Sequence, residues 1–151
     1  MSQSSVLIIF PNQLFKNHPG LKTGIKKIIL IEDSLFFGDH TYQNNLHKQK
    51  LWLHRASMKN YASWLESKDF EVSYEEHSMK TDVLLRLLKR LKSEKDLNVI
   101  MCETHDYELN RRLKNHVRQL SLKLDVLPSP MFLNSNEENS KYRDGKKRWF
   151  M

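Results

Sequence analysis

Short runs rich in apolar residues recur along the chain and, after the first two, alternate with amphipathic stretches. The runs have the length of β-strands and fall at residues 6–10, 28–31, 70–74, 99–102 and 124–127. Continuous apolar runs are typical of strands that are buried on both faces of a parallel sheet, with helices covering those faces. The pattern predicts an α/β fold with a five-stranded, mostly parallel sheet.

Residues 82–95 and 106–122 predict helices that lie against the sheet, because their apolar residues recur at helical spacing. Thr104 or Asp106 is expected to cap the start of the second helix. The inward residues of the two helices are predicted to be Val83, Leu84, Leu87, Leu88 and Leu91, and then Leu109, Leu113, Val117 and Leu120. The basic residues of the second helix are expected to point mostly outward: Arg111, Arg112, Lys114 and Arg118.

A third helix, predicted at residues 45–67, carries polar groups within its apolar arc. The apolar arc comprises Leu46, Leu51, Leu53, Met58, Tyr61, Ala62, Trp64 and Leu65. The polar residues inside it are His47, Lys50, His54 and Ser57. A buried polar group without a hydrogen bond costs about 1–3 kcal/mol, so these four are expected to be satisfied by other residues, by water or by a ligand.

Composition narrows the functional classes. Cys102 is the only cysteine, so this chain alone cannot form an internal disulfide, a four-cysteine zinc site or an iron-sulfur cluster. The apolar run at 6–10 is too short to span a membrane, and no basic segment precedes it, so we expect a cytoplasmic protein. The formal charge of +7 would attract anions such as nucleic acid, or it is solvated surface.

Ligands of parallel sheets bind beyond the carboxyl ends of the strands, which here are followed by polar and aromatic residues. Asn12 and Gln13 offer amides that match the edge of a heterocycle, and Phe36 and Phe37 could stack on its face. Turn formation after Pro11 and packing of the two phenylalanines explain the same residues equally well.

Other chemistries are disfavoured. Neither glycine-rich phosphate-binding pattern occurs among the four glycines, and His47 and His54 lie two helical turns apart, which does not suit a metal site. Glu32 and Asp33 end a strand and should point to opposite sides of the sheet. No catalytic residue is predicted.

Residues 134–147 are polar and predict a linker, so the domain should end near residue 133. The last six residues are basic and aromatic, and Trp149 and Phe150 would gain stability by burial against further sequence. We therefore expect that residues 134–151 lead into another domain.

Several ordered segments resemble the amino-terminal domain of the deoxyribodipyrimidine photolyase-related proteins, a branch of the cryptochrome and photolyase family that includes the iron-sulfur bacterial enzymes. They are Phe-Pro-Asn-Gln-Leu at 10–14, Glu-Asp-Ser-Leu-Phe-Phe-Gly-Asp at 32–39, His-Lys-Gln-Lys at 47–50 and His-Arg-Ala-Ser-Met-Lys at 54–59. Glu103, Tyr107 and Phe132-Leu133 add to the likeness, which covers essentially the whole chain.

The resemblance implies a Rossmann-like three-layer sandwich at 1–133 that packs, in full-length members, against a helical domain carrying FAD and often an iron-sulfur cluster. DNA would be bound by the full-length protein, and this chain alone is expected to be inactive. The amino-terminal domain can hold an antenna pigment, a ribityl-lumazine in the iron-sulfur branch. Positions that match its crevice are Asn12, Gln13, Leu14, Glu32, Phe36 and Lys50.

Two other functions remain open at this point. A basic adaptor would bind nucleic acid through Arg111, Arg112, Lys114 and Arg118. A stand-alone small-molecule sensor would use the same fold. An exposed domain interface would also favour a dimer.

Overall fold

The computed structural model describes residues 4–38, 46–94, 97–144 and 146. Trp149 and Phe150, whose burial the sequence raised, lie outside the described residues. The strands are β1 (Ser4–Ile9), β2 (Lys27–Ile31), β3 (Glu71–Glu75), β4 (Leu97–Cys102) and β5 (Leu124–Leu127). The helices are η1 (Pro19–Lys22), α1 (Ser34–Phe37), α2 (Lys48–Glu66), α3 (Val83–Lys92), α4 (Tyr107–Leu120) and α5 (Asn136–Arg143).

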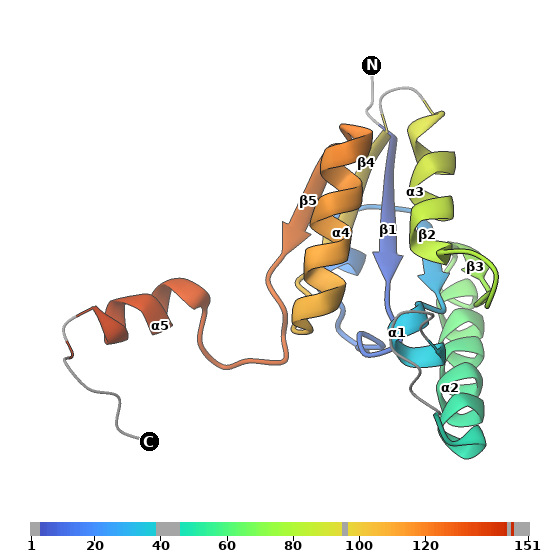
Figure 1. The fold of residues 1–151 in the computed structure, drawn as a ribbon, viewed down its shortest axis with the longest axis horizontal. Coiled ribbons are helices and arrows are strands. Elements are labelled where there is room, and N and C mark those ends of the chain that lie inside the picture. Colours follow the sequence, from blue (N-terminus) through green and yellow to red (C-terminus); the bar gives the residue numbers. More distant parts are fainter. Residues whose placement is uncertain (1–3, 39–45, 95–96, 145, 147–151) are drawn as a thin grey trace.

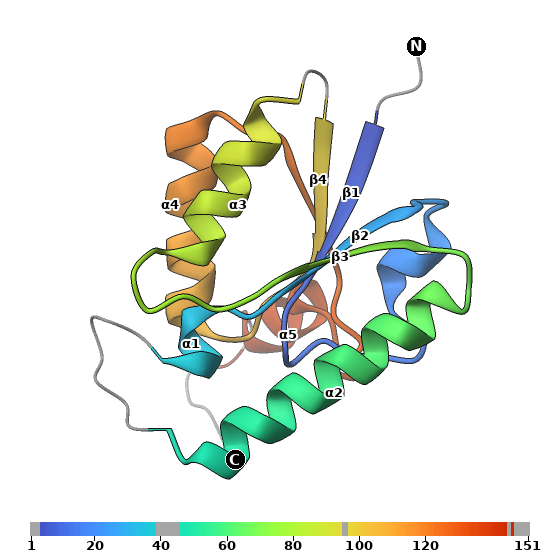
Figure 2. The same ribbon diagram turned by 90° about the vertical axis from the view of Figure 1, so that its right-hand side faces the viewer.

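The five strands form one sheet in the order β3-β2-β1-β4-β5, and every neighbouring pair is parallel. This confirms the α/β prediction and is consistent with a Rossmann-like sandwich. In Figure 1 all strands run towards the same edge of the sheet, with α3 and α4 in front of it. Figure 2 shows α2 and η1 on the other face.

Alternation along β1 builds two separate apolar cores. Val6 and Ile8 pack with α3 and α4, whereas Leu7 and Ile9 pack with α2 and η1. Because these side chains are almost fully removed from water on both faces, the hydrophobic effect holds the three layers together. Gly20 lets η1 lie close to β1, since a Cβ there would lie 2.5 Å from Leu7 Cδ1.

Helices α3 and α4 agree with the sequence. All five predicted inward residues of α3 are buried, and Asp82 and Asp106 cap the two helices by accepting hydrogen bonds from Leu85 N and Leu109 N. Leu109 and Leu113 are buried, while Val117 and Leu120 are partly buried against the same core. Asp106, one of the two predicted caps, is therefore the one used.

Helix α2 corrects the sequence analysis. Its buried residues are Met58, Tyr61, Ala62 and Leu65, all in its second half. Leu53 is 60% exposed, and His47, Lys50 and Ser57 are exposed as well, so these polar groups do not interrupt a dry face. The reason is length: 19 residues of helix extend about 28 Å, whereas a five-residue strand extends about 17 Å. Figure 2 shows the first turns of α2 reaching beyond the sheet.

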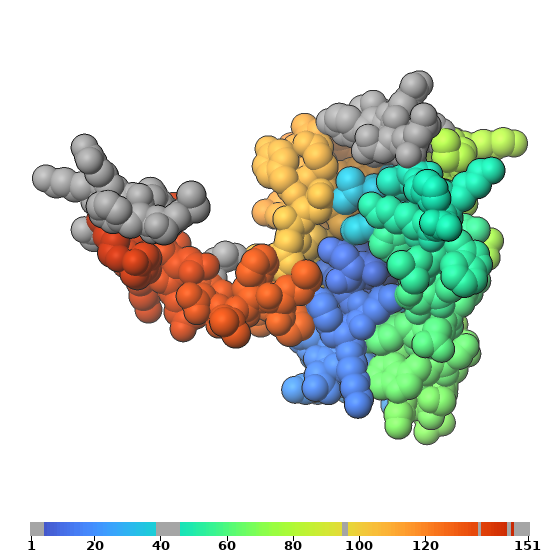
Figure 3. Space-filling view, turned by 90° about the horizontal axis from the view of Figure 1, so that it is seen from below, coloured from blue at the N-terminus to red at the C-terminus, as the bar shows by residue number. Residues whose placement is uncertain are grey.

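The segment predicted as a linker contains α5. Ser135 and Glu138 form a reciprocal capping box at its start, with Ser135 N donating to Glu138 and Glu138 N donating to Ser135 Oγ. Figure 3, which looks onto the carboxyl edge of the sheet, shows the arm that carries α5 extending to one side of the body. Among the described residues, no helix has the length and apolar character needed to cross a bilayer.

Candidate functional site

The strand order reverses direction at β1, whose two neighbours are β2 and β4. The carboxyl ends of β1 and β4 therefore flank the topological switch point, where open parallel sheets bind their ligands. The loop after β1 carries Asn12, Gln13 and Leu14, and the loop after β4 carries Glu103 and Thr104. Asn12 and Gln13 of the first loop are the amides that the sequence suggested for a ligand.

Gln13 joins these two loops. Its side chain is 1% exposed, and its Nε2 donates to the carbonyl oxygens of Cys102 at 3.0 Å and Glu103 at 3.2 Å. Its Oε1 accepts a long hydrogen bond of 3.4 Å from Phe10 N. Because both ends of the amide are used inside the protein, Gln13 shapes the switch point and has little left to offer a ligand.

Two polar atoms beside this bridge are buried and have no hydrogen-bond partner in the described structure. They are Asn12 Oδ1 and Thr104 Oγ1, each one residue from a member of the Gln13–Glu103 hydrogen bond. An unpaired buried acceptor or hydroxyl loses its water without compensation, so such atoms often mark a binding position. Leu14, next in the loop, is half-buried against the α2 core.

Glu32, at the end of β2, is fully buried and accepts four hydrogen bonds. Arg55 of α2 donates from Nε to Oε1 at 2.6 Å and from Nη2 to Oε2 at 2.5 Å. Tyr74 Oη donates to Oε1 at 2.8 Å, and His77 N donates to Oε2 at 3.0 Å. Glu32 therefore ties β2 to α2, to β3 and to the loop after β3.

Electrostatics keep Glu32 ionised. Burial alone would raise its pKa, but the hydrogen bonds from Arg55, from His77 N and from Tyr74 outweigh burial and leave the pKa below its ordinary value. The pKa of Tyr74 is raised in turn, by burial first and by Glu32 second.

Asp33 points to the other face, as the sequence predicted for neighbouring strand-end residues. Its carboxylate caps α1 through Leu35 N at 3.0 Å and pairs with Arg112 of α4, which also donates to Ser34 Oγ at 2.5 Å. Burial raises the pKa of Asp33 although Arg112 opposes the shift. The side chain of Arg112 is 22% exposed, so this residue points inward and the outward expectation for it was wrong.

Phe36 lies beside α2, where its ring meets the imidazole of His54 with centroids 5.9 Å apart. Phe37 is buried, and the Arg55 guanidinium lies 5.5 Å from the centroid of its ring. Lys50 is exposed near His54 and, after burial, is the second cause of a lowered His54 pKa. The structure thus gathers Glu32, Phe36 and Lys50 around the first half of α2, while Asn12 and Gln13 lie at the switch point.

The basic residues of α4 do not form one free surface. Arg111 is exposed but paired with Glu108 at 2.6 Å, and Arg112 is paired with Asp33. Lys114 and Arg118 are exposed as well. Carboxylates neutralise the paired cations, so the case for a nucleic-acid adaptor becomes weaker.

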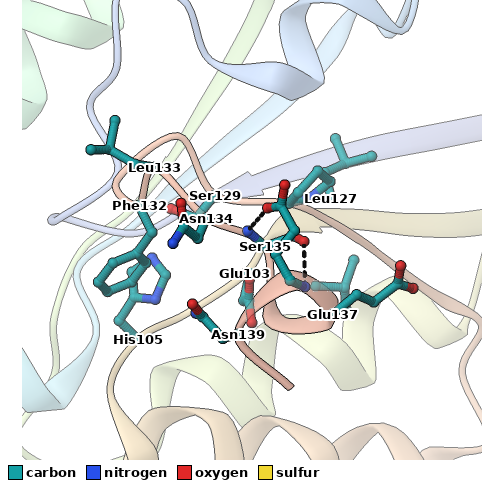
Figure 4. Close-up of a pocket in the computed structure, with 13 residues that line it drawn as sticks. Glu103, His105, Leu127, Ser129, Phe132, Leu133, Asn134, Ser135, Glu137 and Asn139 are labelled. Atoms are coloured by element: carbon teal, nitrogen blue, oxygen red, sulfur yellow. Dashed lines mark hydrogen bonds between the residues drawn. The ribbon is translucent and has the colours of Figure 1, made fainter. Parts of the chain in front are cut away.

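A cavity of about 660 Å³, which the sequence did not predict, lies between the end of β5 and α5. Figure 4 shows Glu103, His105, Phe132, Asn134 and Asn139 around it. The capping-box spacing of Ser135 and Glu138 was the signal that a helix, and hence a wall, forms in this segment.

In the part of the chain that the structure describes, no three His, Cys, Asp or Glu side chains lie close enough together to bind a metal ion. Cys102 is buried, its Sγ lies 3.5 Å from the Pro128 carbonyl oxygen, and burial raises the pKa of its thiol. A thiol in this state is a poor nucleophile.

Comparison of the sequence with known proteins identifies a family. The model of the family described as deoxyribodipyrimidine photo-lyase-related protein matches residues 7–151. An uncharacterised protein of Acanthamoeba polyphaga mimivirus is 28% identical over 144 residues, which cover 94% of this chain and 72% of that protein. The match to the family model includes both loops of the switch point and the α5 segment.

Proposed function

Because the chain belongs to the deoxyribodipyrimidine photo-lyase-related protein family, we propose that it is the antenna-type α/β domain of a photolyase-related flavoprotein. In this proposal the domain holds a light-harvesting pigment at the switch point of its sheet. The light-driven step, whether DNA repair or light sensing, belongs to a helical FAD domain of the full-length protein. This domain by itself is inactive, and DNA is bound by the full-length protein.

One observation carries the proposal: Asn12 Oδ1 and Thr104 Oγ1 are buried and unpaired at the place where open parallel sheets bind ligands. Structural polar groups nearby, such as Gln13, are fully hydrogen-bonded. A ligand that supplies partners to the two unpaired atoms would recover the hydrogen bonds that burial has removed.

A ribityl-lumazine fits this donor and acceptor set. Its ring has an N–H that an amide oxygen such as Asn12 Oδ1 accepts, and carbonyl oxygens to which the Thr104 hydroxyl donates. When bound, the pigment would absorb light and pass the excitation to the flavin. Glu32 and Phe36 serve in this proposal as support, because Glu32 is held by Arg55 and Phe36 packs against His54.

Fluorescence titration tests the proposal. Ribityl-lumazine emission should be quenched in a saturable way by the purified domain. Asn12→Ala and Thr104→Val should each weaken binding by about three- to tenfold, the value of one hydrogen bond. Asn115→Ala, an identical change at an exposed position of α4, should leave the affinity unchanged.

Emission that stays constant at high protein concentration would remove the antenna role. If Asn12→Ala, Thr104→Val and the control Asn115→Ala all changed the lumazine affinity to the same extent, the pigment would bind elsewhere on the protein.

A further inference from the structure

The cavity between β5 and α5 borders the switch point, since Glu103 of the loop after β4 lines it, but it has its own chemistry. Its walls come from the loop after β4, the end of β5, residues 128–135 and the start of α5. A volume of about 660 Å³ falls within the range of sites that hold small molecules. Figure 4 shows Glu103, His105, Phe132 and Asn139 around one space.

Charge is the most selective property of this cavity. The chain carries 25 Lys and Arg against 18 Asp and Glu, yet among the described residues no Lys or Arg lines the cavity. Three glutamates do line it: Glu103, Glu137 and Glu138. Hydrogen bonds from Ser135 lower the pKa of Glu138, so this carboxylate stays ionised. Phosphates and carboxylates would be repelled, whereas cations would be attracted.

The wall also offers an aromatic contact and an unused polar atom. The rings of His105 and Phe132 meet edge to face, with centroids 4.2 Å apart. His105 Nε2 is buried and has no hydrogen-bond partner among the described residues. In Figure 4 the imidazole lies at the cavity wall between Phe132 and Asn139. A ligand N–H could supply the missing partner.

We propose that this cavity binds an organic cation, a guanidinium or ammonium group carried on a flat apolar body. The Glu103 carboxylate faces the cationic group, and His105 Nε2 accepts one of its N–H donors. Phe132 contacts the apolar body and adds a cation–π attraction. Asn134 and Asn139 place further amide oxygens around the same group.

Benzylguanidinium is a suitable probe, with benzylurea as its uncharged match in shape. Titration of the ¹⁵N-labelled chain by NMR should give saturable shifts at residues 103–105 and 126–139 with benzylguanidinium, at a dissociation constant of roughly 1 mM or below. Benzylurea should bind at least about tenfold more weakly, because it lacks the charge that Glu103 selects.

Variants separate the site from general charge attraction. Glu103→Gln should weaken benzylguanidinium binding by about tenfold, and Phe132→Ala by about three- to tenfold. Phe132 is 60% exposed, so its truncation leaves the fold intact. Glu66→Gln makes the same charge change at an exposed position of α2 and should have no effect.

Three results would overturn the proposal. They are equal affinity for the urea and the guanidinium, shifts that map away from β5 and α5, and an equal loss in Glu103→Gln and Glu66→Gln. None of them bears on lumazine binding, so the cavity and the pigment site stand or fall separately.

Discussion

Arg55 contacts both carboxylate oxygens of Glu32, with its Nε and Nη2 atoms 2.6 Å and 2.5 Å away. The carboxylate is fully buried, while half of the Arg55 side chain remains exposed. The half-exposed Arg55 of α2 therefore neutralises the buried charge of Glu32 at the end of β2. Tyr74 and His77 N complete the set of donors.

Removing Arg55 should therefore destabilise the domain more than an ordinary surface change. We expect Arg55→Ala to lower the free energy of unfolding by about 2–3 kcal/mol at neutral pH, below the range for fully buried pairs because Arg55 is half exposed. Adding Glu32→Gln should recover part of the loss, since Tyr74 and His77 N can still donate to an amide oxygen. Urea denaturation measures both effects, and additive losses would contradict the pairing.

The same pair gives a pH dependence. The pKa of Glu32 is lowered in the folded state, so its contribution is present above the ordinary pKa and is lost as the pH falls through the lowered one. The difference in stability between wild type and Arg55→Ala should shrink as the pH falls below about 4.5. A difference that is constant from neutral pH into this range would show that the charge of Glu32 is not involved.

Neighbouring residues Asn12 and Gln13 should respond in opposite ways to the same substitution. Gln13→Ala leaves the Cys102 and Glu103 carbonyls without their donor and should cost about 2 kcal/mol of unfolding free energy. Asn12→Ala removes an oxygen that has no partner and should change stability by less than about 0.5 kcal/mol, while weakening pigment binding. Thermal denaturation together with the lumazine titration distinguishes the two roles, and comparable stability losses would refute the assignment.

Arg112 and Asp33 form an ion pair on the α4 side, and we expect Arg112→Met to destabilise the domain by about 3 kcal/mol. The pKa of Asp33 is already raised by burial, so without Arg112 its ionisation opposes folding further. The loss should therefore grow as the pH rises through the Asp33 pKa. Asp33→Asn in the same background should restore much of the stability, because an asparagine still caps α1. Chemical denaturation of the two single variants and the double variant gives the coupling.

His18 should make the domain sensitive to mild acid. Burial lowers the pKa of His18 to about 4, and its Nδ1 accepts a hydrogen bond of 3.1 Å from Gly20 N at the start of η1. As the pH falls from 6.5 towards 4, His18 becomes protonated in the unfolded chain but stays neutral in the folded chain. Stability should then decrease by roughly 3 kcal/mol at most.

His18→Asn is the matched variant for this test. Asparagine keeps a side-chain acceptor for Gly20 N but does not titrate, so the stability loss between these pH values should become smaller. An unchanged slope would assign the acid sensitivity to other groups.

Local pattern was sufficient for the elements and for the direction of many side chains. The inward residues of α3, the cap at Asp106 and the opposite directions of Glu32 and Asp33 follow from the periods of helices and strands. The same reasoning failed for α2, which is longer than the sheet that it covers. Leu53 shares a helical arc with Met58, yet it is 60% exposed because the first turns of α2 reach beyond the sheet.

Sequence by itself determined the strands, the layers they imply and the loops at the carboxyl edge, because short-range periodicity and backbone chemistry encode these features. Only the tertiary structure decided which polar groups of those loops are already used. Gln13 donates to residues 89 and 90 positions away, and Arg112 reaches Asp33 across 79 positions. Which residues become such partners depends on the order of the strands in the sheet, and the local sequence pattern does not determine this order. For the same reason the cavity between β5 and α5 became visible only when distant segments were brought together.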